Sequence, residues 1–121
     1  MKPVTPTRLA RLLAAREQVQ NARGGSSEID TVLTALFDRD KGLVALPLTT
    51  RSALLFLQVE REGLRVDTIE MRAGSPWCVI LVWENDDGIC ARGHGATLEL
   101  AIAAALLTAL VMMETGEASH D

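Results

Sequence analysis

The hydrophobic pattern is strongest between Trp77 and Trp83, where seven consecutive apolar residues are rich in β-branched and aromatic side chains. This composition predicts a β-strand. Alternation divides its side chains between two faces, one with Trp77, Val79, Leu81 and Trp83 and the other with Cys78, Ile80 and Val82. A strand with one face in water would carry polar residues at alternate positions. The pattern therefore predicts that both faces of this strand are covered.

The residues that follow this strand predict a hairpin. Asn85 to Gly88 suit a tight turn, because Asn and Asp tolerate turn geometry and glycine accepts a positive φ. Ile89 to Arg92 then predict a short return strand. The segment Gly93-His94-Gly95 is expected to end that strand before the chain enters its last helix.

The last long pattern is an apolar helix from Leu98 to Met113, with Glu99 as its only charged residue. Thr97 suits the N-cap, and Glu99 lies where the helix dipole favours a carboxylate. The uncharged part, Leu100 to Met113, has 14 residues, fewer than the roughly 20 that span a bilayer. Because the helix is apolar nearly all round, we predict a buried helix that is covered on more than one side, by another helix or a second subunit.

Three helices and one strand are predicted before the apolar run. The first helix begins at the Thr5-Pro6 cap and ends near residues 21–25, and the second begins at the capping box of Ser27 and stops at residues 38–42. The third spans Arg51 to Glu62. Leu64 to Arg72 predict a strand whose apolar phase slips after Val66, which indicates a bulge or an edge position.

Together these elements predict an α+β fold in which a three-stranded antiparallel meander lies between N-terminal helices and a long C-terminal helix. Because the central strand is apolar on both faces, we expect helices on both sides of the sheet, as a three-layer α-β-α sandwich. Glycines after Arg23 indicate a hinge. The predicted parts are a basic helical arm at 1–24, a sandwich domain at 27–113 and a disordered tail at 114–121.

Charge is distributed unevenly along the chain. The net charge is −4, but residues 1–24 carry +4 and the remainder −8. A basic arm on an acidic body could bind nucleic acid, or it could be the solvated face of an amphipathic helix. The candidate nucleic-acid contacts are Arg8, Arg11, Arg16 and Arg23. The candidate protein contacts are the apolar residues of the first and last helices, Leu9, Leu12, Leu13, Met112 and Met113.

Candidate chemistry is sparse, and we expect no enzyme, metal or cofactor. Cys90 and His94 are the best catalytic candidates, but their spacing crosses a strand end, so a contact between them is possible and not specified. Zinc would need paired ligand spacings that the chain lacks. Pairing across the turn would set Cys90 opposite Trp83 rather than Cys78. Reduced thiols and the absence of a secretory signal predict a cytoplasmic protein.

The chain resembles the phage ABA sandwich domain family, small proteins of bacteriophages and prophages, over residues 27–113. The residues that carry the resemblance are Ile29-Asp30-Thr31-Val32-Leu33, Leu48-Thr49-Thr50, the Trp77 strand, Gly95-Ala96-Thr97-Leu98-Glu99-Leu100-Ala101-Ile102 and Ala104-Ala105-Leu106. The resemblance implies an α-β-α sandwich in the bacterial host cytoplasm and names no substrate. Small phage proteins of this kind often bind a host protein, including defence machinery.

Two other families share part of this pattern. Double-stranded RNA-binding domains also end in a meander and an alanine-rich helix, but they place lysines where this chain has Leu98-Glu99, and a carboxylate repels phosphate. HicB-type antitoxins share the acidic turn and the Gly-x-Thr-Leu-Glu helix start, without the DNA-binding segment expected after Glu114.

The sequence therefore predicts a non-enzymatic phage or prophage accessory protein that acts by protein–protein interaction, with an inhibitor of a host defence system, similar to an anti-CRISPR protein, as the specific version. A host protein is the expected partner, and a homodimer is a further hypothesis based on the apolar closing helix. The alternative is a nucleic-acid-binding or antitoxin-like regulatory protein that uses the basic first helix.

Overall fold

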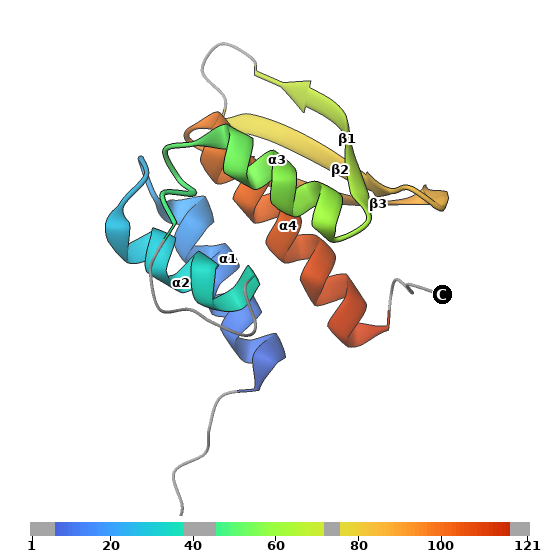
Figure 1. The fold of residues 1–121 in the computed structure, drawn as a ribbon, viewed down its shortest axis with the longest axis horizontal. Helices are drawn as coiled ribbons and strands as arrows, with labels where there is room; N and C mark the ends of the chain where they lie inside the picture. The colour runs from blue at the N-terminus through green and yellow to red at the C-terminus, as the bar shows by residue number, and fades with distance from the viewer. Residues whose placement is uncertain (1–6, 38–45, 72–75, 117–121) are drawn as a thin grey trace, which may run out of the picture.

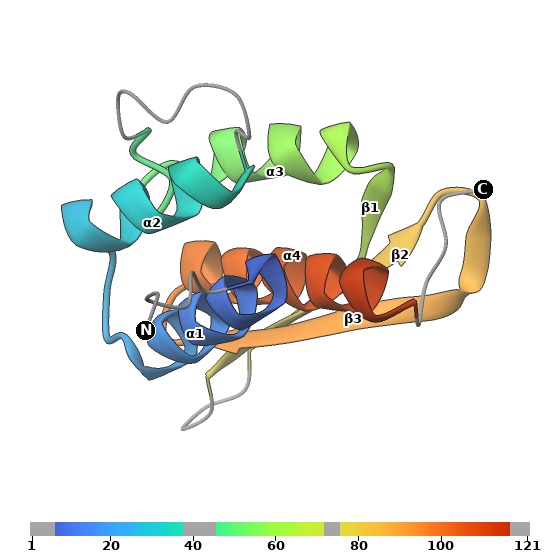
Figure 2. The ribbon, with the colours of Figure 1, turned by 90° about the horizontal axis from the view of Figure 1, so that it is seen from below.

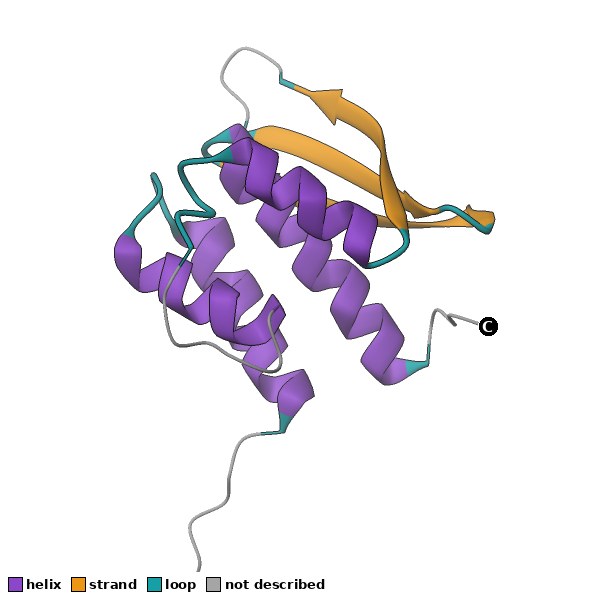
Figure 3. Cartoon of the chain, in the orientation of Figure 1, coloured by secondary structure: helices purple, strands orange, loops and turns teal. Residues whose placement is uncertain are grey.

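The computed structural model describes residues 7–37, 46–71 and 76–116, which form helices and one antiparallel sheet (Figures 1 and 3). In chain order the elements are α1 Arg8–Asn21, α2 Ser27–Phe37, α3 Ser52–Arg61, β1 Leu64–Glu70, β2 Trp77–Trp83, β3 Asp86–Gly95 and α4 Leu98–Thr115. The predicted α+β class, with N-terminal helices, a three-stranded antiparallel meander and a long C-terminal helix, is confirmed.

The sheet has the order β1-β2-β3, so the strand predicted to be central is central. The predicted slip in β1 is a shift of register between Val66 and Thr68. A second irregularity after Val82 sets Cys90 opposite Val82, so the predicted pairing of Cys90 with Trp83 is wrong. Trp83 is 2% exposed and belongs to the core.

β3 does not stop at Arg92 as predicted, because Gly93 and Gly95 remain in the ladder opposite Val79 and Trp77. These glycines serve close packing. A Cβ on Gly93 would lie on the backbone of α4, 2.6 Å from the carbonyl oxygen of Ala101, and one on Gly95 would lie 2.5 Å from the amide nitrogen of Ala101. Side chains here would push α4 off the sheet, so glycine in a strand marks a close backbone approach.

α4 is the centre of the molecule. It packs against β3 and β2 on one side and against α1 and α3 on others, and its residues from Leu100 to Leu107 are all buried. Thr97 caps it as predicted, because its Oγ1 accepts a hydrogen bond of 3.2 Å from the amide of Leu100. By length and composition α4 could cross a membrane, but most of it is buried inside the protein, as in the core helix of a soluble protein.

The layers are stacked in a different order from the predicted α-β-α sandwich. Figure 2 shows the sheet on one side of α4 and α1, with α2 and α3 on the other side. Within the described residues the face of β3 turned away from α4 is solvent-exposed at Cys90, Arg92 and His94. β2 is shielded on this face by its neighbours, so Val82, between Arg65 and Cys90, is only 5% exposed without a helix above it.

α1 packs on the same core as the sheet. Leu12, Ala15 and Val19 are at most 2% exposed and belong to one cluster with α4. Two polar contacts join these helices further, an ion pair of 3.2 Å between Arg8 and Glu114 and a 3.5 Å hydrogen bond from Arg16 to Thr108. The predicted arm is therefore docked along α4 over its described residues. Of the predicted tail at 114–121, Glu114 and Thr115 belong to α4 and Gly116 caps it. Residues 1–6 and 117–121 lie outside the described part of the chain.

Candidate functional site

α2 buries Ile29, Leu33 and Leu36 in the core and packs mainly against α1. A buried polar junction at its first turn also holds it, where Asp30 Oδ1 accepts hydrogen bonds from the amide of Thr49 at 2.8 Å and from its hydroxyl at 2.7 Å. Thr49 Oγ1 in turn accepts from the amide of Ser26 at 3.1 Å. Asp30 is 8% exposed, so its carboxylate needs these donors to offset its lost hydration.

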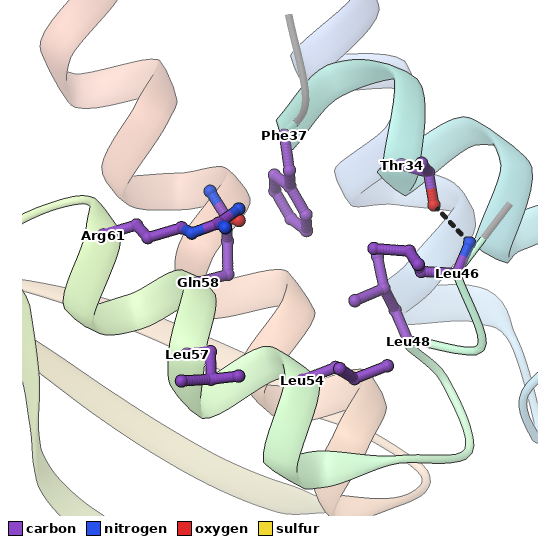
Figure 4. Close-up of a pocket in the computed structure, with 8 residues that line it drawn as sticks. All are labelled: Thr34, Phe37, Leu46, Leu48, Leu54, Leu57, Gln58 and Arg61. Atoms are coloured by element: carbon purple, nitrogen blue, oxygen red, sulfur yellow. Dashed lines mark hydrogen bonds between the residues drawn. The ribbon is translucent and has the colours of Figure 1, made fainter. Parts of the chain in front are cut away.

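A second tie lies at the other end of the helix, where Thr34 Oγ1 accepts a 2.9 Å hydrogen bond from the amide of Leu46. Between these two ties α2 and α3 do not pack closely. A hollow therefore opens between them, which we call the α2–α3 hollow (Figure 4). Its empty volume is about 510 Å³, part of it open to solvent. It is lined by Thr34, Phe37, Leu46, Leu48, Leu54, Leu57, Gln58 and Arg61.

The lining of the α2–α3 hollow is mostly apolar and partly uncovered. Figure 4 shows Phe37 pointing from α2 into the space between the helices, with Leu54 and Leu57 on the α3 side. Leu57 is 56% exposed and Leu46 44%, among the highest values for large apolar side chains in the described residues. Such a cluster of uncovered leucines around a concavity is typical of a surface that binds another molecule.

Polar groups mark one end of this hollow. Gln58 is 8% exposed and donates a 3.0 Å hydrogen bond from Nε2 to Glu62 Oε1. Arg61 is exposed and forms no ion pair with any of the described residues. The hollow thus combines an apolar floor with one positive charge at its rim, and it favours an apolar group that lies next to a carboxylate.

A second depression, the α1–α2 groove, lies on the other side of α2. Its lining combines small and apolar residues with Arg11 and Gln18, and its empty volume is about 820 Å³ including open solvent. The residues are Arg11, Ala14, Ala15, Gln18, Thr31, Val32, Ala35 and Leu36. None of the residues that line this groove is an exposed large apolar side chain.

The four predicted nucleic-acid contacts do not form one free basic surface. Arg8 pairs with Glu114 and also donates to the carbonyl of Leu36 at 3.2 Å, and Arg16 lies against α4. Arg11 and Arg23 are exposed, and within the described residues they form no ion pair. Two of the four guanidinium groups therefore bond to other parts of the fold.

The five predicted protein contacts are also divided. Leu12 is fully buried, while Leu9, Met112 and Met113 are partly buried against the core. Leu13 is the one that stays accessible, at 39% exposure. Leu46 and Leu57 were not among the residues predicted from the sequence. The only sequence signal for their exposure would be an apolar residue at a position where the solvent-facing side of its segment is otherwise polar.

The structure does not assemble a catalytic pair from Cys90 and His94. Both are exposed, but they lie four residues apart on the same face of β3, and the residue opposite His94 is Cys78. Four residues of strand separate two Cα atoms by about 13 Å, beyond hydrogen-bond reach of these side chains. No cluster of three metal-ligating side chains occurs among the described residues.

Comparison with known proteins adds no assignment. No family model, no curated protein and no solved structure matches this chain. The resemblance to the phage ABA sandwich family therefore stays a prediction, and the site is interpreted from its own geometry.

Proposed function

We propose that this protein is a non-enzymatic accessory protein that acts by binding another protein, and that the α2–α3 hollow receives an apolar side chain of that partner. The observation that supports this proposal is the uncovered apolar lining of the hollow, with Leu57 at 56% exposure beside Phe37 and Leu54. Water in contact with these side chains is released when a partner fills the space.

The expected gain is that of a binding hot spot. Burying one leucine- or phenylalanine-sized side chain contributes roughly 1.5–3 kcal/mol, and protein interfaces concentrate their affinity in a few such anchors. Arg61 adds selectivity, because a partner with a carboxylate next to its apolar anchor would form an ion pair at the rim, whereas a basic partner would be repelled.

The biological setting rests on the sequence resemblance. A small phage or prophage protein in the bacterial cytoplasm would meet host proteins first, and an inhibitor of a host defence system is the specific version that we propose. An acidic apolar segment of such a host protein is the partner chemistry that the hollow favours.

The test compares capture of host proteins by three forms of the full chain. Leu57→Asp places a carboxylate in the hollow, and Leu13→Asp makes the same change on α1, at an exposed leucine outside the hollow. We expect Leu57→Asp to lose a partner that the parent protein and Leu13→Asp retain, with affinity of the purified pair lowered at least tenfold. Equal capture by all three forms would refute the role of the hollow.

A second candidate, nucleic-acid binding, is supported by the two exposed arginines, Arg11 and Arg23. Two phosphate contacts would give a slope of about −1.8 for the logarithm of affinity against the logarithm of salt concentration. Titration of labelled DNA and RNA with the parent protein and with the Arg11→Ala, Arg23→Ala double variant measures this slope. Binding that the double variant retains unchanged would exclude these residues as the contacts.

A further inference from the structure

One end of the α2–α3 hollow carries a hydrogen-bond acceptor that the fold leaves unused. Gln58 lies there, on the side nearest Phe37 (Figure 4). Its Nε2 donates to Glu62 Oε1, and this bond assigns the other end of the amide as the oxygen. Gln58 is only 8% exposed, yet its Oε1 accepts no hydrogen bond from the described residues. Because protein atoms do not enclose Oε1, a ligand in the hollow can reach it and supply the missing donor.

A positive charge lies beside this acceptor. Arg61 lines the hollow, is exposed and forms no ion pair with any of the described residues. It follows Gln58 by three positions on α3, and side chains at this spacing are neighbours, with Cβ atoms about 5–6 Å apart. This end of the hollow therefore offers an acceptor and a cation together, next to an apolar floor.

We propose that the α2–α3 hollow binds the C-terminal residue of a partner protein. The apolar side chain of that residue would lie among the leucines, its α-carboxylate would bind Arg61, and its backbone N–H would donate to Gln58 Oε1. A guanidinium forms short, charge-assisted hydrogen bonds with a carboxylate, often two in parallel. This inference rests on the proposed function, and it names the part of the partner that enters the hollow.

A chain terminus matches this arrangement better than an internal acidic residue does. In a C-terminal residue the N–H, the carboxylate and the side chain are all attached to one Cα, so the three groups reach neighbouring points of the hollow together. An internal acidic residue has its carboxylate on one residue and needs the apolar side chain of another. Both side chains must then be ordered on binding, which costs additional conformational entropy. Capture of a C-terminal carboxylate is also a recurring mode of peptide recognition.

The size of the hollow agrees with a single residue. Its empty volume of about 510 Å³ includes open solvent, whereas pockets that enclose a drug-sized molecule have about 300–1,000 Å³. The four leucines of its lining favour an aliphatic side chain. One residue makes few contacts, so an isolated ligand of this kind should bind with a millimolar dissociation constant, and the rest of the partner would add affinity.

The test is an NMR titration of the isotope-labelled full chain with N-acetyl-L-leucine, which carries all three groups. We expect changes in amide chemical shift centred on Leu57 and Gln58. N-acetyl-L-leucinamide lacks the charge and should bind about tenfold more weakly, and isocaproate, which lacks the N–H, about threefold more weakly. An amide that binds as tightly as the acid overturns the inference, and so does the absence of binding by the acid.

A further ligand distinguishes a chain terminus from an internal acidic segment. N-acetyl-aspartyl-leucinamide carries a carboxylate and a leucine side chain, but its terminus is blocked. We expect it to bind at least about threefold more weakly than N-acetyl-L-leucine, because its charge and its side chain belong to different residues. Equal affinity would assign an internal acidic segment to the hollow and overturn the terminal residue.

Two arginine variants test the role of the charge. Arg61→Gln should reduce the preference for acid over amide from about tenfold to less than about twofold. Arg51→Gln changes an exposed arginine that precedes α3 outside the hollow, and should leave the preference unchanged. A preference that persists in Arg61→Gln overturns the assignment, and circular dichroism confirms that both variants are folded. Equal binding of acid and amide would leave the proposed function standing, because that function requires only that Leu57→Asp loses a protein partner.

Discussion

The sharpest consequence of this fold concerns Gly93, where a single methyl group should separate α4 from the sheet. The Cβ of Gly93→Ala would fall on the backbone of α4, 2.6 Å from the carbonyl oxygen of Ala101 and 2.7 Å from the carbonyl carbon of Ala104. Ordinary van der Waals contact begins at about 3.4–4 Å, so the helix must move by roughly 1 Å. No rotamer change can relieve the overlap, because both partners are backbone.

The expected loss of stability follows from the gap that this movement opens between α4 and the sheet. A gap of 0.5–1 Å forfeits a quarter to a half of each dispersion contact, and the contact between α4 and β3 is the most extensive in the described fold. Overpacking of this kind costs about 1–3 kcal/mol and sometimes more. We expect the upper end, about 3 kcal/mol, which lowers the Tm of a domain of this length by about 12 °C.

The assay is thermal and urea unfolding followed by circular dichroism. Two matched variants serve as controls. Gly24→Ala adds the same methyl group where nothing lies within 4 Å, and Arg92→Ala shortens the neighbour of Gly93 that points away from α4. Both should stay within about 1 kcal/mol of the parent protein. A Gly93→Ala protein with a Tm within 2 °C of the parent would refute this explanation of the helix–sheet packing.

Three further outcomes are expected from unfolding measurements. Asp30→Ala leaves the buried donors of Thr49 without their acceptor and should cost about 1–3 kcal/mol, whereas an unchanged midpoint would show that water replaces the carboxylate. Gly63→Ala places a side chain at φ +74°, so a loss of about 1 kcal/mol is expected although the space around it is open, and a gain would contradict the strain argument. Glu114→Gln removes the charge from the pair with Arg8, whose side chains are 23% and 37% exposed, and should cost less than 1 kcal/mol in low salt and almost nothing in 1 M salt.

Much of the local structure could be predicted from the chain itself. The seven apolar residues of β2, the phase slip in β1 and the cap at Thr97 report preferences that act over a few residues, and the structure confirms each. Local patterns are reliable here because strand alternation and helix capping depend on neighbours in sequence.

Most of the candidate site could not be predicted from the sequence. The four arginines of residues 1–24 have the same side chain, yet Arg8 and Arg16 contact α4 and α2 while Arg11 and Arg23 face solvent. That division depends on the angle at which α1 docks. The α2–α3 hollow likewise depends on tertiary contacts, because α2 is tied to the segment before α3 at Thr49 and Leu46. The hollow between the two helices is lined by leucines that helical periodicity would assign to a core.

The sequence by itself determined which segments are helices and strands, which residues can be buried, and that the last helix lies in the core. Only the tertiary structure decided on which side of the sheet the helices lie. Because β3 has glycines at Gly93 and Gly95, the backbone of α4 can pack directly on the backbone of one face of the sheet. The other helices then bury their apolar residues on the same side as α4, and not on the opposite face of the sheet. The alternation of apolar residues along a strand indicates that a face of the sheet can be buried. Which element buries it depends on close packing between residues that are far apart in the chain.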